Sequence, residues 1–108
     1  MLESKWSEGE MRLRIALETE PSSAEAYNTL GSLYFFRGDL DAAQHQFKEA
    51  VKLKPDFAQA HYNLGLVFEK RMENEKAATQ FQLSLQADPG NRVVREELDK
   101  VEHNISKR

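Results

Sequence analysis

The three prolines of this chain, Pro21, Pro55 and Pro89, stand 34 residues apart each time. A period of about 20–50 residues is typical of folds that stack one small unit on the next, because each unit buries its apolar face against its neighbours. Other residues recur at the same interval. Going forward by 34 leads from Leu30, Gly31, Tyr34, Ala43, Phe47 and Ala50 to Leu64, Gly65, Phe68, Ala77, Phe81 and Ser84. The period therefore indicates a repeat fold.

Each repeat is expected to contain two helices. In the first repeat the apolar pattern predicts helices over residues 24–37 and 40–54, separated by a turn at Gly38 and Asp39. Glycine suits the left-handed residue just past a helix end, and the following aspartate can cap the next helix. Proline after each second helix cannot continue it. The expected capping boxes at the two repeat starts are Ser22 with Glu25 and Asp56 with Gln59.

The second repeat departs from the first at its turn. Met72 stands where the first repeat has Gly38, and Asn74 stands where it has Leu40. A bulky residue in a left-handed conformation costs about 1 kcal/mol. The second turn is therefore the place where the two repeats are expected to differ. A smaller departure near the start of the chain is Gly9, which replaces the helix-favouring Ala43 slot.

These residues together resemble the tetratricopeptide repeat (TPR) signature. The match consists of Tyr27-x2-Leu30-Gly31-x2-Tyr34, then Ala43-x3-Phe47, then Pro55, and the second repeat restates it with His61 in the first aromatic slot. The resemblance implies an all-α, right-handed superhelix of antiparallel helix pairs. It identifies a scaffold, which by itself does not specify one function.

The two ends complete the expected TPR solenoid with single helices. Residues 1–21 resemble the second helix of a partial repeat, 24–57 and 58–91 are full repeats, and 92–108 form a closing helix with a polar outer face. The total is six helices in a single domain, about the minimum that is stable alone. Met1 is compatible with a natural start and with a cut inside a longer array.

The resemblance implies that first helices line a concave face and second helices a convex face. A partner segment is then expected to lie against first-helix residues that point away from the core. The predicted partner-binding residues are Asn28, Ser32, Phe35, Phe36, Tyr62, Asn63, Leu66, Lys70 and Val93. Phe36 stands out because its slot holds Lys70 in the next repeat. An apolar strip of Phe36, Tyr62, Leu66 and Val93 would receive a partner's side chains, whereas the alternative for Phe35 and Phe36 is packing between successive helices.

One known use of the family can be checked slot by slot. Members that grip acidic C-terminal tails of heat-shock chaperones hold the carboxylate with cations and amides. The matching slots here contain Asn28 and Ser32, then Asn63, then Val93 and Glu97. Only Asn63 fits, and Glu97 would repel an acidic ligand. The sequence therefore predicts that this carboxylate clamp is missing.

Composition narrows the partner class further. Fifteen basic residues face 18 acidic ones, for a net charge of −3, so a nucleic-acid partner is not expected. No apolar run is long enough to insert in a membrane, and no secretion signal opens the chain, which favours the cytoplasm by default. The three histidines and the many carboxylates form no catalytic or metal-binding motif. We therefore expect a protein or peptide partner, no cofactor, no metal and no enzymatic activity.

Self-assembly is the competing function. The opening helix presents Met11 and Ile15 where the first repeat has His45 and Glu49. Exposed apolar residues one turn apart can associate. The predicted self-association residues are Trp6, Met11 and Ile15, acting through a two-fold homodimer of opening helices or through head-to-tail stacking. Glu96, Glu97 and Glu102 on the closing helix argue against continuous stacking.

Overall fold

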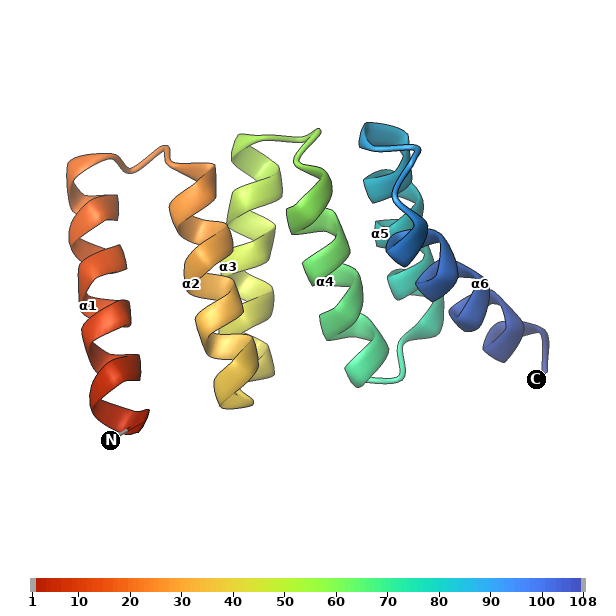
Figure 1. The fold of residues 1–108 in the computed structure, drawn as a ribbon, viewed down its shortest axis with the longest axis horizontal. Helices are drawn as coiled ribbons and strands as arrows, with labels where there is room; N and C mark the ends of the chain where they lie inside the picture. Colours follow the sequence, from red (N-terminus) through yellow and green to blue (C-terminus); the bar gives the residue numbers. More distant parts are fainter. Residues whose placement is uncertain (1, 108) are drawn as a thin grey trace. The chain divides into compact units, whose positions relative to one another are not determined.

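The computed structural model describes residues 2–107, and residues 1 and 108 of the expected end segments lie outside them. Within this range the chain is all-α, with six helices and no strand (Figure 1). The helices are α1 (Leu2–Thr19), α2 (Ala24–Arg37), α3 (Leu40–Leu53), α4 (Ala58–Lys70), α5 (Asn74–Ala87) and α6 (Arg92–Ser106). The expected six-helix fold is therefore confirmed. None of these helices combines the length and the hydropathy that crossing a bilayer requires.

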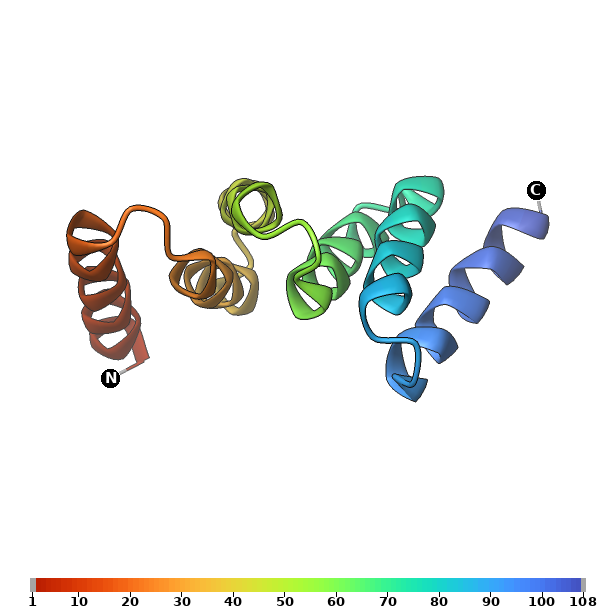
Figure 2. The same cartoon turned by 90° about the horizontal axis from the view of Figure 1, so that it is seen from above.

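The chain divides into two compact units, Met1–Pro55 and Asp56–Arg108. In the first unit α2 packs against α3, and α1 packs against α2. In the second unit α5 packs against both α4 and α6, as the teal, green and blue helices of Figure 2 show. The division falls directly after Pro55, so each unit keeps one whole helix pair of the 34-residue repeat.

A glycine facing a phenylalanine fixes the close approach of the helices in each pair. A Cβ atom on Gly31 would lie 2.6 Å from the Phe47 ring, and one on Gly65 would lie 2.5 Å from the Phe81 ring. Phe47 and Phe81 are fully buried. The recurring Leu-Gly and Phe residues are thus a packing device, because only a residue without a side chain leaves room for the ring.

The two turns have the same conformation, contrary to the expected difference. Gly38 has φ 86° and Met72 has φ 62°, both left-handed. The backbone hydrogen bonds also correspond: Asp39 N donates to Tyr34 O at 3.0 Å, and Glu73 N donates to Phe68 O at 2.9 Å. The packing of α4 on α5 therefore imposes the left-handed residue even where the side chain disfavours it, at a cost of about 1 kcal/mol.

Two further predictions, both about helix capping, are wrong. The α2 cap is Ser23, whose hydroxyl accepts a hydrogen bond from Ala26 N at 3.1 Å, rather than Ser22. At α4 the capping residue is Phe57, and no side chain caps the helix, so the Asp56 box does not form. Two neighbouring polar residues cannot be told apart by sequence pattern alone. The Asp39 cap is confirmed, since its carboxylate accepts from Ala42 N at 3.1 Å.

Candidate partner-binding faces

The outer face of α2 presents a large aromatic side chain to solvent. Phe36 is 75% exposed, and its ring meets Phe35 edge-on, with centroids 6.0 Å apart and planes at 83°. Phe36 lies on the side of α2 opposite Leu30 and Tyr34, which are buried in the core. Burying such a ring is favourable, so Phe36 is the strongest apolar contact point on this helix.

The other predicted residues of α2 differ in how much surface they offer. Phe35 and Ser32 are half-buried, and the Ser32 hydroxyl donates to the Asn28 carbonyl oxygen at 3.1 Å. Asn28 itself is only 6% exposed. Its side chain therefore offers a partner almost no surface, and we do not include it in the face that we propose below.

In the second unit the predicted residues lie on α4 and α6. Tyr62, Asn63 and Leu66 are half-buried, and Lys70 and Val93 are exposed. The Tyr62 ring also packs on Phe81, with centroids 5.8 Å apart. Truncation of Tyr62 would therefore disturb the core as well as the surface, which makes it a poor probe of binding.

A charged cluster on the same side of α4 and α6 was not predicted as a site. Lys100 Nζ lies 3.2 Å from Glu69 Oε2 and 3.1 Å from Glu97 Oε2, which links the two helices. We call these three residues the Glu69–Glu97–Lys100 triad. Burial of the Glu69 carboxyl, and then the neighbouring Glu97 carboxyl, raise the pKa of Glu69, although Lys100 acts in the opposite direction. Burial and the charges of Glu97 and Glu69 also raise the pKa of the Tyr62 hydroxyl.

A second polar cluster attaches α1 to α2. The Glu10 carboxylate accepts from the Tyr34 hydroxyl at 2.8 Å and from Arg14 Nε at 2.9 Å, and Arg37 Nη1 lies 3.3 Å from it. Arg14 also donates to the Tyr34 hydroxyl at 2.7 Å. Hydrogen bonds from Tyr34 and Arg14 lower the pKa of Glu10. This Glu10 cluster has a structural role, since it joins side chains from two helices.

The predicted self-association residues lie on two sides of α1. Met11 is 63% exposed and Ile15 is 55% exposed, and they line an open groove of about 390 Å³ with Ser7, Glu10, Arg14 and Glu18. Trp6 is half-buried, and helical spacing places it with Leu13, Leu17 and Glu10 on the side that meets α2. The structure therefore brings Met11 and Ile15 together and separates Trp6 from them.

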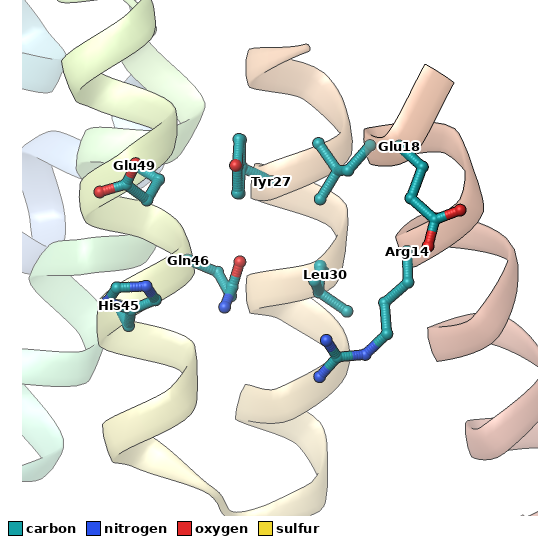
Figure 3. Close-up of a pocket in the computed structure, with 8 residues that line it drawn as sticks. Arg14, Glu18, Tyr27, Leu30, His45, Gln46 and Glu49 are labelled. Carbon is teal, nitrogen blue, oxygen red and sulfur yellow. The ribbon is translucent and has the colours of Figure 1, made fainter. Parts of the chain in front are cut away.

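The first unit also contains an open cleft that is lined by side chains of α1, α2 and α3 (Figure 3). Its volume is about 390 Å³, and the side chains that line it are mostly polar. Arg14 and Glu18 come from α1, Tyr27 and Leu30 from α2, and His45, Gln46 and Glu49 from α3. No sequence signal marked these residues, because the cleft depends on where α1 lies beside the helix pair. Among the described residues no group of His, Asp and Glu could hold a metal ion.

Comparisons with known proteins agree on the fold. The family model described as tetratricopeptide repeat matches residues 28–92, which is more than half of the chain. A search of curated proteins found no match.

Solved TPR domains superimpose on most of the chain. The first TPR of Spaghetti (RPAP3), solved with the HSP90 peptide SRMEEVD, has a TM-score of 0.90 at 19% identity, covering 96% of this chain and 82% of that one. The Sgt2 TPR domain from Aspergillus fumigatus has a TM-score of 0.88 at 16% identity, covering 99% of this chain and 72% of that one.

MamA is similar as well, with a TM-score of 0.86 at 26% identity over 94% of this chain. The chain spans only 55% of the length of that MamA chain. The signature residues, the glycine-aromatic packing of both helix pairs and the match over residues 28–92 lead to one assignment. The chain belongs to the tetratricopeptide repeat family, a family of protein-interaction scaffolds.

Proposed function

We propose that this chain is a non-catalytic scaffold that holds a peptide segment of a partner protein. The segment lies on the exposed faces of α2, α4 and α6, the first helices of their repeats. These are the faces that the family resemblance assigns to the concave groove. In the first unit the face consists of Ser32, Phe35 and Phe36 on α2. In the second unit it consists of Tyr62, Asn63, Leu66 and Lys70 on α4 and Val93 on α6. The exposure of Phe36 is the observation that carries this proposal.

The chemistry of Phe36 supports a binding role. Beyond its edge-on contact with Phe35, the exposed Phe36 ring contributes little to folding, whereas a partner that covers it removes a large apolar area from water. Interfaces concentrate their binding energy in a few such anchors. The similar TPR of Spaghetti (RPAP3) was solved with a bound peptide, which supports the fold as a peptide holder. We do not expect this chain to bind acidic peptides of that kind, because Glu97 stands where a carboxylate clamp needs a cation.

The test is peptide selection followed by measurement of affinity. We expect that a phage-displayed library of random peptides yields binders of the wild-type chain. Phe36→Ala should weaken the best binder about tenfold, or about 1.4 kcal/mol, in a fluorescence anisotropy titration. Its melting temperature should change little, because the ring is mostly outside the core.

Met72→Ala is the matched control for this experiment. Met72 is 79% exposed, close to the value for Phe36, but it lies in the turn between α4 and α5. Its truncation should leave peptide affinity unchanged. Equal affinities of all three proteins for the selected peptides would contradict the binding role of Phe36, and a library that yields no binder would contradict the proposed function.

Self-association through α1 is a second candidate function, and the exposure of Met11 and Ile15 favours it. Head-to-tail stacking would require α6 to act as the first helix of a further pair. The slot that holds Gly31 and Gly65 in the full repeats holds Asp99 in α6, so stacking would place this carboxylate against Leu13, which α1 carries in the slot of Phe47 and Phe81, and burying an unpaired carboxylate is costly. A two-fold pairing of α1 helices is therefore the form that we propose.

The oligomeric state tests this second candidate. If α1 pairs, the wild-type chain should show a concentration-dependent dimer in size-exclusion chromatography with light scattering. Met11→Glu with Ile15→Glu should convert it to a monomer, since four buried carboxylates cannot face one another without a large desolvation cost. A wild-type chain that stays monomeric at high concentration would remove the proposal.

A further inference from the structure

The triad on α4 and α6 has more negative than positive charge. Two carboxylates, Glu69 and Glu97, share the single ammonium group of Lys100. The glutamate side chains are 21% and 24% exposed, whereas the lysine side chain is 56% exposed. Glu97 Oε2 is shielded from water and accepts no well-aligned hydrogen bond from the described residues. One ammonium group therefore pairs with two partly buried carboxylates, and its side chain is the most exposed of the three.

Apolar side chains precede the charges on both helices. Tyr62, Leu66 and Glu69 follow one another at helical spacing on α4, and Val93, Glu97 and Lys100 do so on α6. Residues three and four apart lie on one helix face. The Glu69–Lys100 ion pair brings these two faces together. Each helix therefore presents apolar side chains on the face that also carries its charges: Tyr62 and Leu66 on α4, and Val93 on α6.

We infer that this surface takes a lysine or arginine side chain of the partner peptide between Glu69 and Glu97, with a neighbouring apolar residue of the peptide on Tyr62, Leu66 and Val93. This inference rests on the proposed function and names the chemistry of its ligand. The incoming cation replaces the Lys100 ammonium, which returns to water on its flexible stem.

Three physical reasons select a cationic, partly apolar segment as the occupant. Charge complementarity favours it, because two carboxylates flank the position and an acidic residue would be repelled by both. The carboxylates are already oriented and partly desolvated, so a charged hydrogen bond there is stronger than one at the open surface. The half-buried ring of Tyr62, on the α4 face that also carries Glu69, adds apolar surface for the aliphatic stem of that lysine or arginine. The raised pKa of Glu69 agrees, since it shows that Lys100 only partly offsets burial and the neighbouring charge.

The decisive experiment uses two substitutions with opposite expected signs. Peptides selected from the random library by the wild-type chain should be enriched in Lys or Arg beside an apolar residue. For one such peptide, Glu97→Gln should weaken binding about tenfold, and Lys100→Gln should tighten it, because the resident competitor is removed. Circular dichroism and thermal melting establish that both variants fold.

A purely structural triad would behave differently, because removal of either partner would then weaken binding. Weaker binding in Lys100→Gln, an unchanged affinity in Glu97→Gln, or selected peptides without a cation would each overturn the inference. Peptides that lack a cation but still depend on Phe36 would overturn the inference alone. A library that yields no binder would overturn the proposed function and this inference with it.

Discussion

Gly65→Ala is expected to destabilise the chain by about 1–3 kcal/mol, whereas Gly9→Ala is expected to stabilise it by about 0.5–1 kcal/mol. Both changes replace glycine by alanine inside a helix, where alanine is the better residue. They differ in what the new methyl group meets. At Gly65 it would lie 2.5 and 2.7 Å from two carbons of the Phe81 ring, and at Gly9 it would lie 3.6 Å from Leu33, an ordinary contact.

The Phe81 ring cannot move aside, because it is fully buried between α4 and α5 and also contacts Tyr62. The strain should therefore be relieved by a smaller residue at position 81. We expect Gly65→Ala with Phe81→Leu to lose less stability than the sum of the two single variants. Urea unfolding followed by circular dichroism measures the free energies of unfolding of the wild type, the three single variants and the double variant. Equal stability changes for Gly65→Ala and Gly9→Ala would show that the glycine-aromatic contact does not set the spacing of the pair.

Glu10→Ala is expected to destabilise the first unit by about 1–2 kcal/mol and to loosen α1 from α2. The substitution removes the carboxylate that accepts hydrogen bonds from Tyr34 and Arg14 and pairs with Arg37. Trp6 is the single tryptophan of the chain and lies on the α2-facing side of α1, so its fluorescence reports whether this helix is packed. Its emission should shift towards that of a solvent-exposed indole in the variant.

The same cluster predicts a dependence on acid pH. Hydrogen bonds from Tyr34 and Arg14 lower the pKa of Glu10 below its ordinary value of 4.5. A lowered pKa means that the ionised carboxylate stabilises the folded state above pH 4.5, and that this contribution is lost as the pH falls through the folded-state pKa. The Trp6 signal of the wild type should change in that acid range, and the change should be absent in Glu10→Ala.

Glu8→Ala is the control for the Glu10 cluster. Glu8 lies on α1 two residues away and is exposed. Its removal should leave the stability and the Trp6 emission close to wild type. A loss of stability as large as that of Glu10→Ala would mean that net charge on α1, rather than the attachment to Tyr34, is responsible.

The sequence alone predicted the repeat, the all-α fold and, to within one residue, the two helices of the first repeat. Residues 24–37 were predicted and observed as one helix, and the start of the next at Leu40 was also placed correctly. These features are local or periodic: glycine at a turn, proline after a helix, and apolar residues that recur every 34 positions. Such signals can be read from one sequence, because each depends on residues close in the chain or on a regular spacing.

The partner-facing chemistry was only partly visible in the sequence. The helical spacing placed Phe36 on the face opposite the core, where it is exposed, but it placed Asn28 on a neighbouring position without indicating that this side chain is buried. The capping residue Ser23 was missed in favour of its neighbour Ser22. Exposure and capping depend on small rotations of a helix, which the apolar pattern does not define.

Only the tertiary structure decided which charged side chains meet. Glu10 and Tyr34 are 24 residues apart, and Glu69 and Lys100 come from helices separated by the whole of α5. In the sequence these residues belong to ordinary charged faces of amphipathic helices. Their pairing follows from the angle and distance at which the helices pack, and these are set by buried contacts such as Gly65 on Phe81. A charge acquires a specific partner only when packing fixes its position.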